Sequence, residues 1–332
     1  MKLSVVICTR DRPDTVGQAI ESVAECDYPS RYDIHVMDQS TNTHTRDIVH
    51  DLAQRFASKC DIVYHFLDKA GLSRAYNAGM RVSTGDVVAG TDDDVVVPKD
   101  WLTEIDRAFV ADPQLGLLYG QVLIPDSLKE AERSGELIVP HLLIEKRERL
   151  VQGRGFKIFG MGANMAIRRS SFELVGGFDE ALGGGGPLRS SQDFDFAFRM
   201  YRKNQAVLLA PEVKVDHYGS RTQAQWTGTM KAYGIGDGAF YSKHIRCGDP
   251  LALYYFSKVV LYNNARRVKK LLKERRWPED DYLPSLFVGV RDAAKFGIDR
   301  KYRLFRERRA GQMTVTEANA VTGQQRTKET GS

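Results

Sequence analysis

Apolar segments of strand length alternate with segments of helical periodicity through the first 98 residues. Short runs rich in β-branched and aromatic residues predict strands at residues 3–8, 32–38, 61–67 and 86–90. Apolar residues recur near helical spacing at residues 15–26, 43–56 and 72–83. Strands that alternate with helices pair in parallel through right-handed crossovers, with the helices on the faces of the sheet. The pattern therefore predicts an α/β, Rossmann-like fold with a mainly parallel sheet sandwiched by helices.

Length, composition and cysteine spacing narrow the class of protein. The chain has 332 residues, 42% of them hydrophobic, which is enough to bury one large core. Four cysteines are scattered without a CxxC pair, so neither a disulfide framework nor a thiolate metal site is indicated. The first apolar run is too short for a signal peptide, and no later run approaches the roughly 18 residues that span a bilayer. We expect a cytoplasmic protein.

Positive charge is concentrated in the C-terminal third of the chain. Residues 241–310 hold 18 Lys and Arg against 8 Asp and Glu, whereas the whole chain has a net charge of +5. Basic residues alternate with Leu, Tyr and Phe at 266–276 and 300–309, a pattern that suits helices lying on anionic lipid at the inner membrane face. A solvated helix face explains the pattern equally well. No recognition motif accompanies the charge, so nucleic acid is not an expected partner.

Polar residues follow three of the predicted strands. They are Thr9 and Arg10 after the first, residues 38–41 after the second, and Asp92, Asp93 and Asp94 after the fourth. The carboxyl ends of parallel strands meet at one edge of a sheet, where ligands bind in such folds. Three adjacent carboxylates are tolerable there if Mg²⁺ or Mn²⁺ lies among them, and strand alternation directs Asp92 and Asp94 to one face. The alternative is a polar turn before a helix capped by Asp100.

Six motifs occur in an order that resembles the family 2 nucleotide-sugar glycosyltransferases of GT-A fold. They are SVVICTRDR, VMDQS, GLSRAYNAG, TDDDVVVP, GANMAIRRSSFELVGGFDE and SSQDFDFAFRMYRKN. The resemblance covers roughly residues 2–222. It implies transfer of a sugar from a nucleotide diphosphate donor to an acceptor hydroxyl, with inversion at the anomeric carbon.

The resemblance also implies which residues form the donor site. Contacts with the nucleotide and its sugar are expected from Thr9, Arg10, Asp38, Ser40, Ser73, Arg74, Asp92, Asp93 and Asn164. Asp92 and Asp94 would form the DxD element that holds Mn²⁺ or Mg²⁺, with Asp94 the better ligand. His217 follows a predicted strand and would add a metal or phosphate contact, although a structural role fits it equally well.

The general base is expected at Asp193. The family's Glu-Asp pair becomes Gln192-Asp193 here, so the resemblance points to Asp193 as the group that takes the acceptor proton. Apolar residues at Phe194, Ala197, Phe198 and Tyr201 predict a helix with one face on the core, which puts Asp193 at the helix start. A plain N-cap is the alternative role. The glycine run at 183–187 is predicted to be a loop that closes over the donor, or a simple linker.

These observations together predict an inverting, single-sugar, metal-dependent glycosyltransferase. The motif Gln-x-x-Arg-Trp of processive relatives is absent. A UDP-sugar is the favoured donor, and a hydroxyl of a glycan or lipid-linked molecule is the expected acceptor. Two alternatives remain open: a phosphatase with an aspartyl nucleophile at Asp92 or Asp94, and a module that binds sugar nucleotide or membrane without turnover.

The predicted organisation has three parts. Residues 1–222 form the GT-A domain, with a nucleotide-binding half at 1–98 and a catalytic and acceptor half at 99–222. Residues 223–310 form a basic helical region, and residues 311–332 form a disordered tail.

Overall fold

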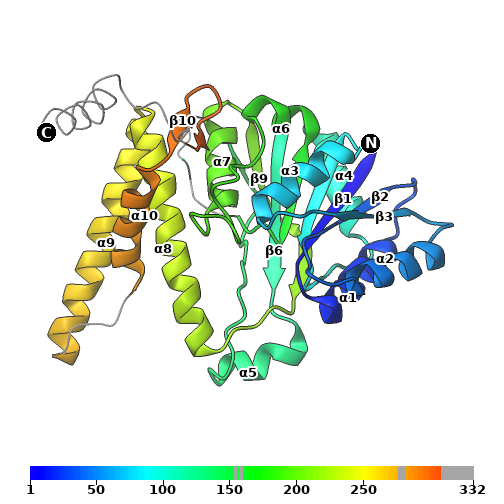
Figure 1. The fold of residues 1–332 in the computed structure, drawn as a ribbon, viewed down its shortest axis with the longest axis horizontal. Coiled ribbons are helices and arrows are strands. Elements are labelled where there is room, and N and C mark those ends of the chain that lie inside the picture. Colours follow the sequence, from blue (N-terminus) through cyan, green and yellow to red (C-terminus); the bar gives the residue numbers. More distant parts are fainter. Residues whose placement is uncertain (153–155, 157–159, 276–280, 308–332) are drawn as a thin grey trace, which may run out of the picture.

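Strands and helices alternate through the first half of the chain, as the sequence predicts (Figure 1). The computed structural model describes residues 1–152, 156, 160–275 and 281–307, so the predicted tail at 311–332 lies outside the described residues. The first elements are β1 (Leu3–Thr9), α1 (Pro13–Ala24), β2 (Asp33–Asp38), α2 (His44–Arg55), β3 (Asp61–Phe66), α3 (Leu72–Val82), β4 (Val87–Asp92), β5 (Val95–Val96), α4 (Trp101–Ala111) and β6 (Leu115–Leu123).

The second half adds short connecting elements and then long helices. In order they are α5 (Lys129–Arg133), β7 (Glu148–Leu150), β8 (Asn164–Arg168), α6 (Arg169–Val175), α7 (Gln192–Arg202), β9 (Ala206–His217), α8 (Gln223–Arg246), α9 (Pro250–Glu274), α10 (Tyr282–Ala293), β10 (Gly297–Asp299) and β11 (Leu304–Arg306).

The central sheet has the order β3-β2-β1-β4-β8-β6-β9-β5, and β7 pairs with β9. Its first four strands run parallel, and so do β6 and β9. The strand β8 runs antiparallel between β4 and β6, where it joins the two parallel parts. The predicted α/β architecture with a largely parallel sheet between helices is confirmed.

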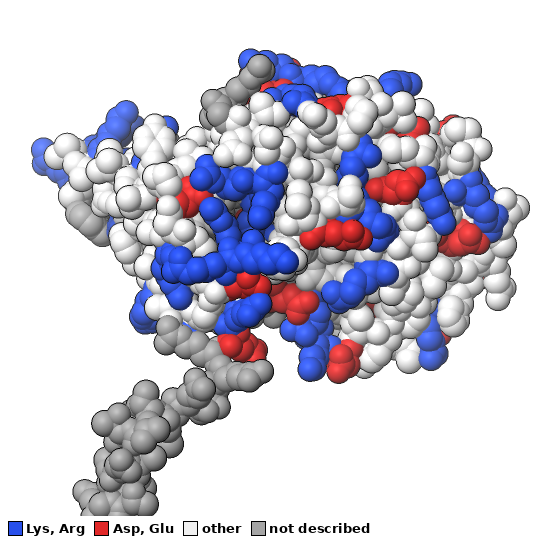
Figure 2. All heavy atoms as spheres, turned by 90° about the horizontal axis from the view of Figure 1, so that it is seen from above, with Lys and Arg blue, Asp and Glu red and all other residues white. Residues whose placement is uncertain are grey.

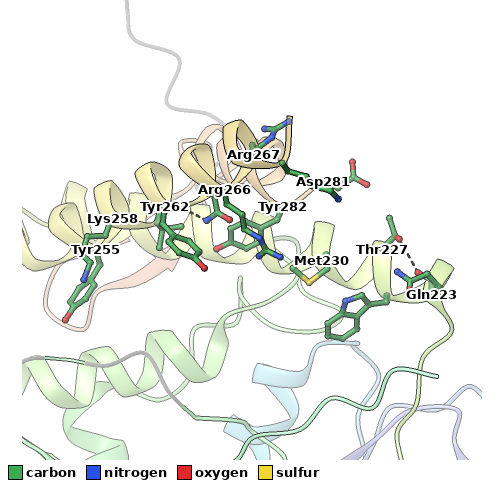
Figure 3. A pocket seen from close by; sticks show the side chains of 14 residues that line it. Gln223, Thr227, Met230, Tyr255, Lys258, Tyr262, Arg266, Arg267, Asp281 and Tyr282 are labelled. Carbon is green, nitrogen blue, oxygen red and sulfur yellow. Dashed lines mark hydrogen bonds between the residues drawn. The ribbon is translucent and has the colours of Figure 1, made fainter. Parts of the chain in front are cut away.

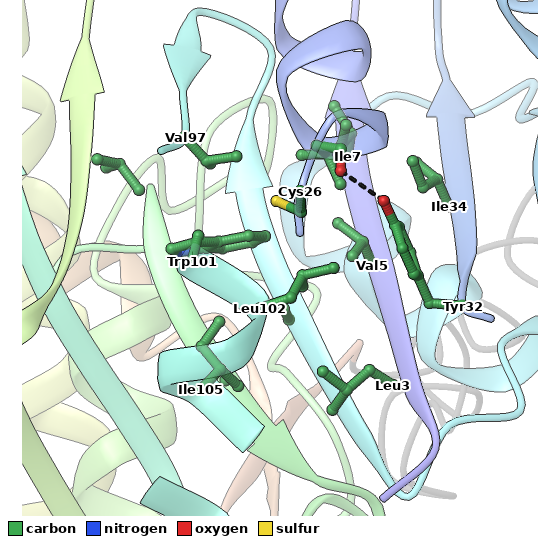
Figure 4. Packing of buried hydrophobic residues seen from close by; sticks show 14 of the residues in the cluster. Leu3, Val5, Ile7, Cys26, Tyr32, Ile34, Val97, Trp101, Leu102 and Ile105 are labelled. Carbon is green, nitrogen blue, oxygen red and sulfur yellow. Dashed lines mark hydrogen bonds between the residues drawn. The ribbon is translucent and has the colours of Figure 1, made fainter. Parts of the chain in front are cut away.

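Helices cover both faces of the sheet with separate hydrophobic cores. On one face, Trp101, Leu102 and Ile105 of α4 pack with Leu3 and Val5 of β1, together with α1 and α2 (Figure 4). On the other face, residues of α3 and α7 pack with α8 and α10. Strands buried on both faces read as continuous apolar runs, as β1 does, which is why the sequence pattern identifies them.

The helices α8 and α10 approach each other through glycines. An added Cβ would lie 1.9 Å from the Leu286 carbonyl oxygen at Gly238, and 2.0 Å from the Ile235 carbonyl oxygen at Gly289. A second glycine of α8, Gly236, faces the backbone of Ser190, just before α7: an added Cβ would lie 2.6 Å from the Ser190 carbonyl carbon. Only residues without a side chain permit backbones to come this close.

The described part of the second basic segment, residues 300–307, is not helical. Residues 304–306 form β11, which pairs with β10 in a hairpin, whereas residues 266–275 of the first segment lie in or directly after α9. The Phe305 N–H donates to the buried Asp179 carboxylate, and this long-range contact favours the extended conformation. Lys and Arg side chains gather on the face seen from above in Figure 2. The hairpin and the end of α7 line a basic cavity of about 190 Å³ with Arg199, Arg202, Lys203, Arg300, Lys301 and Arg303.

Candidate active site

The ends of three parallel strands bring the predicted polar residues together. The register places Thr9 opposite Asp38, and Cys8 opposite Asp92. The Thr9 hydroxyl donates a hydrogen bond of 2.7 Å to Asp93 Oδ2, which joins the end of β1 to the turn after β4. The chain thus gathers its acidic residues at the sheet edge where α/β folds bind ligands.

Asp92, Asp94 and His217 form the acidic centre of this edge. One ligand atom from each lies within 4.8 Å of the other two, and His217 Nε2 is 3.3 Å from Asp94 Oδ1. His217 ends β9, and its pairing with Val95 of β5 sets it beside the aspartates. Two carboxylates and an imidazole form a donor set that suits Mn²⁺ or Mg²⁺. The sequence prediction of these three ligands therefore has a matching geometry.

The electrostatics of the centre also favour a cation. Burial, followed by the charge of Asp94, raises the pKa of Asp92 to about 7. Burial opposes the ionisation of Asp94 as well, but contacts with His217 and Arg12 outweigh it and lower the Asp94 pKa. A divalent ion held by Asp92 and Asp94 would favour their ionised forms, because its charge offsets the repulsion between the two carboxylates.

Arg12 is a site residue that the sequence reading missed. Its guanidinium Nη1 lies 2.9 Å from Asp93 Oδ1 and 2.7 Å from Asp94 Oδ2. Its signal in the sequence was the second arginine of TRDR, which follows the same strand as Arg10. Because it contacts two of the three aspartates, Arg12 holds the turn after β4 against the end of β1.

A cavity of about 340 Å³ opens at this edge, next to the acidic centre. It is lined by Cys8, Thr9, Arg10, Arg12, Gln39, Gly71, Leu72, Asp92, Asp93, Asp94, Gly184, Gly185, His217 and Arg221. Arg10 lies on its rim as predicted. Gln39 and Arg221 were not predicted, and Gln39 holds its place through hydrogen bonds with the carbonyl of Lys69 and the N–H of Gly71.

Several predicted donor residues support the cavity wall instead of lining it. Both Asp38 oxygens are occupied, because they accept from the Ser40 N–H and the Tyr64 hydroxyl. Ser40 Oγ in turn accepts from the Asp11 N–H. Asp38 is fully buried, so its carboxylate fixes the turn after β2 in this structure.

Three more predicted donor residues contact other parts of the protein instead of lining the cavity. Asn164 is fully buried, and its amide bonds to Trp101 Nε1 and to two backbone carbonyls, which removes it from the cavity. The Ser73 hydroxyl donates to the Leu182 carbonyl. Arg74 forms an ion pair of 3.3 Å with Glu180. The structure therefore does not bring these three side chains to the acidic centre.

The glycine-rich segment predicted as a loop forms one wall of the cavity. Gly183 and Gly185 have φ angles of +94° and +76°, which only glycine adopts without strain. The Leu72 N–H at the start of α3 donates to the Gly184 carbonyl at 2.8 Å. The segment is thus hydrogen-bonded to the α3 terminus, directly beside the cavity.

Asp193 lies in the first turn of α7, as predicted, but it is not the N-cap. The helix begins at Gln192, so Ser191 occupies the cap position. Asp193 Oδ1 accepts from the Phe194 N–H at 2.9 Å, and Oδ2 accepts from the Gly162 N–H at 3.3 Å. Burial raises the Asp193 pKa to about 6, although these N–H groups oppose the shift. A carboxylate with this pKa is well matched to general-base chemistry near neutral pH.

The helix α7 is buried on more faces than the sequence predicted. Asp195 and Arg199 are as buried as the apolar residues, and they form an ion pair of 2.8 Å. Asp195 also contacts Lys243 Nζ at 2.6 Å and His244 Nε2 at 2.8 Å, both on α8. Lys243 reaches Asp179 at 2.5 Å. A buried charge network therefore joins the helix that carries Asp193 to the C-terminal region.

The family follows from comparison with known proteins. The family model described as glycosyl transferase family 2 matches residues 4–176 of the chain. The chain belongs to glycosyl transferase family 2. The resemblance seen in the sequence motifs is thereby confirmed. The alternative of a phosphatase with an aspartyl nucleophile loses its basis.

Relatives of this family 2 glycosyltransferase include enzymes from archaea and bacteria. It is 26% identical over 310 residues to the glucosyl-dolichyl phosphate glucuronosyltransferase of Haloferax volcanii, covering 87% of this chain and 92% of that protein. Its fold is similar to a mannosyltransferase of Pyrobaculum calidifontis in complex with GDP-Man and Mn²⁺, with a TM-score of 0.59, 18% identity and coverage of 98% of this chain and 79% of that one. It is also similar to S. aureus TarS 1-349 in complex with UDP-GlcNAc, with a TM-score of 0.52, 15% identity and coverage of 71% and 66%.

No helix in the described parts of this glycosyltransferase has both the length and the apolar character needed to cross a bilayer.

Gly219→Ala is expected to weaken Mn²⁺ binding about tenfold or more. A Cβ at this position would lie 2.4 Å from Asp94 Oδ2 and 2.9 Å from His217 Cε1, so two of the three ligands must shift. Displacements of this size disrupt sites that depend on fixed geometry. Calorimetric titration of Mn²⁺ measures the effect. The matched control is Gly228→Ala, where nothing lies within 4 Å of the added carbon. Equal Mn²⁺ affinity in the two variants would refute the assignment of Asp94 and His217 as metal ligands.

Proposed function

We propose that this glycosyltransferase moves a single sugar, with inversion, from a nucleotide diphosphate donor to a hydroxyl of a glycan or lipid-linked acceptor. The observation that carries the proposal is the acidic centre of Asp92, Asp94 and His217 beside a cavity at the carboxyl edge of the parallel strands. The membership of the family supports sugar transfer. A UDP-sugar is the proposed donor; of the two proteins of similar fold, TarS is in complex with UDP-GlcNAc and the mannosyltransferase with GDP-Man.

The residues around the cavity have distinct proposed roles toward the donor. Asp92, Asp94 and His217 would hold Mn²⁺ or Mg²⁺, which when bound neutralises the charge of the diphosphate leaving group. Thr9 and Asp93 position the end of β1 against the acidic turn. Arg10 and Arg221 line the cavity and supply positive charge for phosphate oxygens. Gln39 fixes the opposite rim beside Gly71.

Asp193 is the proposed general base. Its carboxylate takes the proton of the acceptor hydroxyl while the acceptor oxygen attacks the anomeric carbon from the face opposite the nucleotide. The bond between the anomeric carbon and the phosphate oxygen breaks, and the nucleotide diphosphate leaves with that electron pair. The N–H groups of Phe194 and Gly162 orient the carboxylate for this transfer.

Calorimetric titration of nucleoside diphosphates tests the donor proposal. We expect UDP to bind in the presence of Mn²⁺, and binding to weaken at least about tenfold with a chelator, because Asp92, Asp94 and His217 would hold the metal, whose positive charge would favour the diphosphate. GDP, dTDP and CDP serve as competitors for the same site. Tighter binding of GDP would replace the proposed donor base, and no binding of any diphosphate would refute the function itself.

We also propose that α9 rests on an anionic membrane surface. Its solvent-exposed apolar residues include Leu253, Tyr254, Leu261, Val268 and Leu272, and Leu261 and Leu272 keep 70% and 77% of their surface exposed. The helix also carries Lys258, Arg266, Arg267, Lys269, Lys270 and Lys273. Exposed apolar residues accompanied by basic ones are typical of helices that lie in a membrane interface.

Co-sedimentation with vesicles tests the membrane proposal. The protein is expected to bind vesicles that contain anionic lipid at low salt, and to release from them as salt rises, because each exposed base contributes about 1 kcal/mol near such a surface. Leu261→Glu should reduce binding, since it puts a charge into the apolar contact. Neutral phosphatidylcholine vesicles are the control. Equal binding to neutral and anionic vesicles, or none to either, contradicts the proposal.

A further inference from the structure

A groove separates α8 from α9 and is distinct from the cavity at the strand ends. Its volume is about 750 Å³, and side chains of α8, α9 and α10 line it (Figure 3). In Figure 3, Tyr255, Lys258, Tyr262 and Arg266 extend from α9 toward Met230 of α8 and the body of the protein. Nothing in the donor chemistry proposed above uses this groove.

Apolar and aromatic residues line the groove on both helices. Trp226, Thr227 and Met230 follow Gln223 at helical spacing, so they form one face of α8. Tyr255, Val259 and Tyr262 line the facing side of α9 with the same periodicity. Two helices that present aromatic and aliphatic side chains to an open groove leave space for an elongated apolar ligand.

The other lining residues give the groove a strong positive charge. The α9 side contributes Lys258, Arg266, Arg267 and Lys270, while Asp281 is the one acidic residue among the lining. Asp281 already lies 3.3 Å from Lys231, outside the lining set. Apolar walls with several cations favour an amphiphile whose head group is an anion, because each cation is a charge-assisted hydrogen-bond donor.

Contacts of α8 and α10 connect the groove with the proposed catalytic helix. The Trp226 ring packs edge-on against the Tyr233 ring at 6.2 Å, and partial burial followed by the charge of Asp193 raises the Tyr233 pKa. The hydroxyl of Tyr282, another lining residue, donates to Asp237, which also accepts from the hydroxyl of Ser191. Ser191 is the N-cap of α7, two residues before Asp193.

We infer that the groove binds a lipid phosphate, with its phosphate between Lys258 and Arg266 and its aliphatic chain along Trp226, Met230 and Tyr262. The inference rests on the proposed function, since it makes this lipid phosphate the carrier of the acceptor hydroxyl. A second copy of α9 is a poor occupant, because it would bring like charges together.

Calorimetric titration of geranyl phosphate, a short and soluble lipid phosphate, tests the inference on the full chain. The wild type should bind geranyl phosphate at least about tenfold more tightly than either geraniol or inorganic phosphate. Only geranyl phosphate can contact both the apolar and the basic residues that line the groove. Arg266→Glu should weaken binding about tenfold or more, and Trp226→Ala should weaken it as well. Lys269→Glu is the matched control: it reverses a charge on the same helix outside the groove lining and should change affinity by less than about twofold.

Each outcome decides the assignment. Equal losses in Arg266→Glu and Lys269→Glu would show a general charge effect and overturn the site. Inorganic phosphate that binds as tightly as geranyl phosphate would overturn the lipid as occupant. Titration of UDP with Mn²⁺ in the same variants separates this inference from the proposed function. If UDP binds and geranyl phosphate does not, the groove assignment fails while the donor site stands. The reverse result rejects UDP as the donor while leaving a lipid site.

Discussion

Asp193→Asn is expected to lower kcat by about 10²-fold or more while leaving the affinity for the nucleotide diphosphate unchanged. The amide has the shape of the carboxylate, and its oxygen still accepts from a backbone N–H of α7 or Gly162, so the helix start should keep its conformation. It has no basicity toward an acceptor proton. Steady-state kinetics with the donor and acceptor, together with calorimetry of the nucleotide, separate loss of turnover from loss of binding.

A matched substitution and the pH profile sharpen this test. Asp237→Asn changes a neighbouring carboxylate that accepts only from Ser191 and Tyr282, and its kcat should stay within about tenfold of the wild type. Because burial raises the Asp193 pKa to about 6, the active, ionised form is lost as pH falls through that value. The wild-type kcat should therefore drop about tenfold per pH unit below 6 and stay flat above it. Turnover in Asp193→Asn within threefold of the wild type would rule out Asp193 as the general base. So would an acidic limb of the pH profile that is the same in Asp193→Asn as in the wild type.

Lys243→Ala is expected to destabilise the fold by about 3–5 kcal/mol. The Lys243 ammonium is fully buried and lies 2.5 Å from Asp179 and 2.6 Å from Asp195. Its removal leaves two buried carboxylates with too few cations. His244 does not replace the charge, because burial lowers its pKa to about 4 and keeps the imidazole neutral at pH 7. The midpoint of urea denaturation, followed by circular dichroism at pH 7, measures the loss.

The control for this variant is an ion pair of the same length at the surface. Arg31 and Asp61 also approach to 2.5 Å, but their side chains are 50% and 57% exposed. Water and salt screen such a pair, so Arg31→Ala should shift the midpoint far less than Lys243→Ala. Similar shifts in the two variants would mean that burial does not set the strength of the network.

The fold of the first half was predictable because its signals are local. The predicted strand at residues 3–8 is β1, and the predicted helix at 72–83 is α3, each within a residue or so at either end. Strands buried on both faces give unbroken apolar runs, and helices give a recurrent apolar face. The antiparallel insertion of β8 and the β10–β11 hairpin depend on pairing with segments far away in the sequence. No local pattern encodes such partners.

The candidate site likewise combines residues that local sequence signals identify with residues that only long-range contacts bring to it. Asp92, Asp94 and His217 come together as predicted, but not through strand alternation: Asp94 lies in the turn between β4 and β5, and His217 reaches it through the pairing of β9 with β5. Arg12 and Gln39 entered the site through contacts that periodicity does not report. Asp38 was expected to meet the nucleotide, but Tyr64 from the neighbouring strand occupies one of its oxygens. The buried role of Asp195 also depends on Lys243, which lies 48 positions later in the chain.

The glycine contacts of α8 bear on how such enzymes diversify. The sequence predicts a boundary between the transferase domain and the helical region at residue 222. A boundary of this kind favours exchange of whole C-terminal segments between paralogues. Gly236 faces Ser190 before the catalytic helix, and Gly234 and Gly238 face α10. A recombinant chimera that brought any side chain to these three positions would push apart helices that meet backbone to backbone. Under the groove assignment proposed above, acceptor specificity is open to change through point substitutions along the groove, whereas grafted helices must carry the glycine pattern with them.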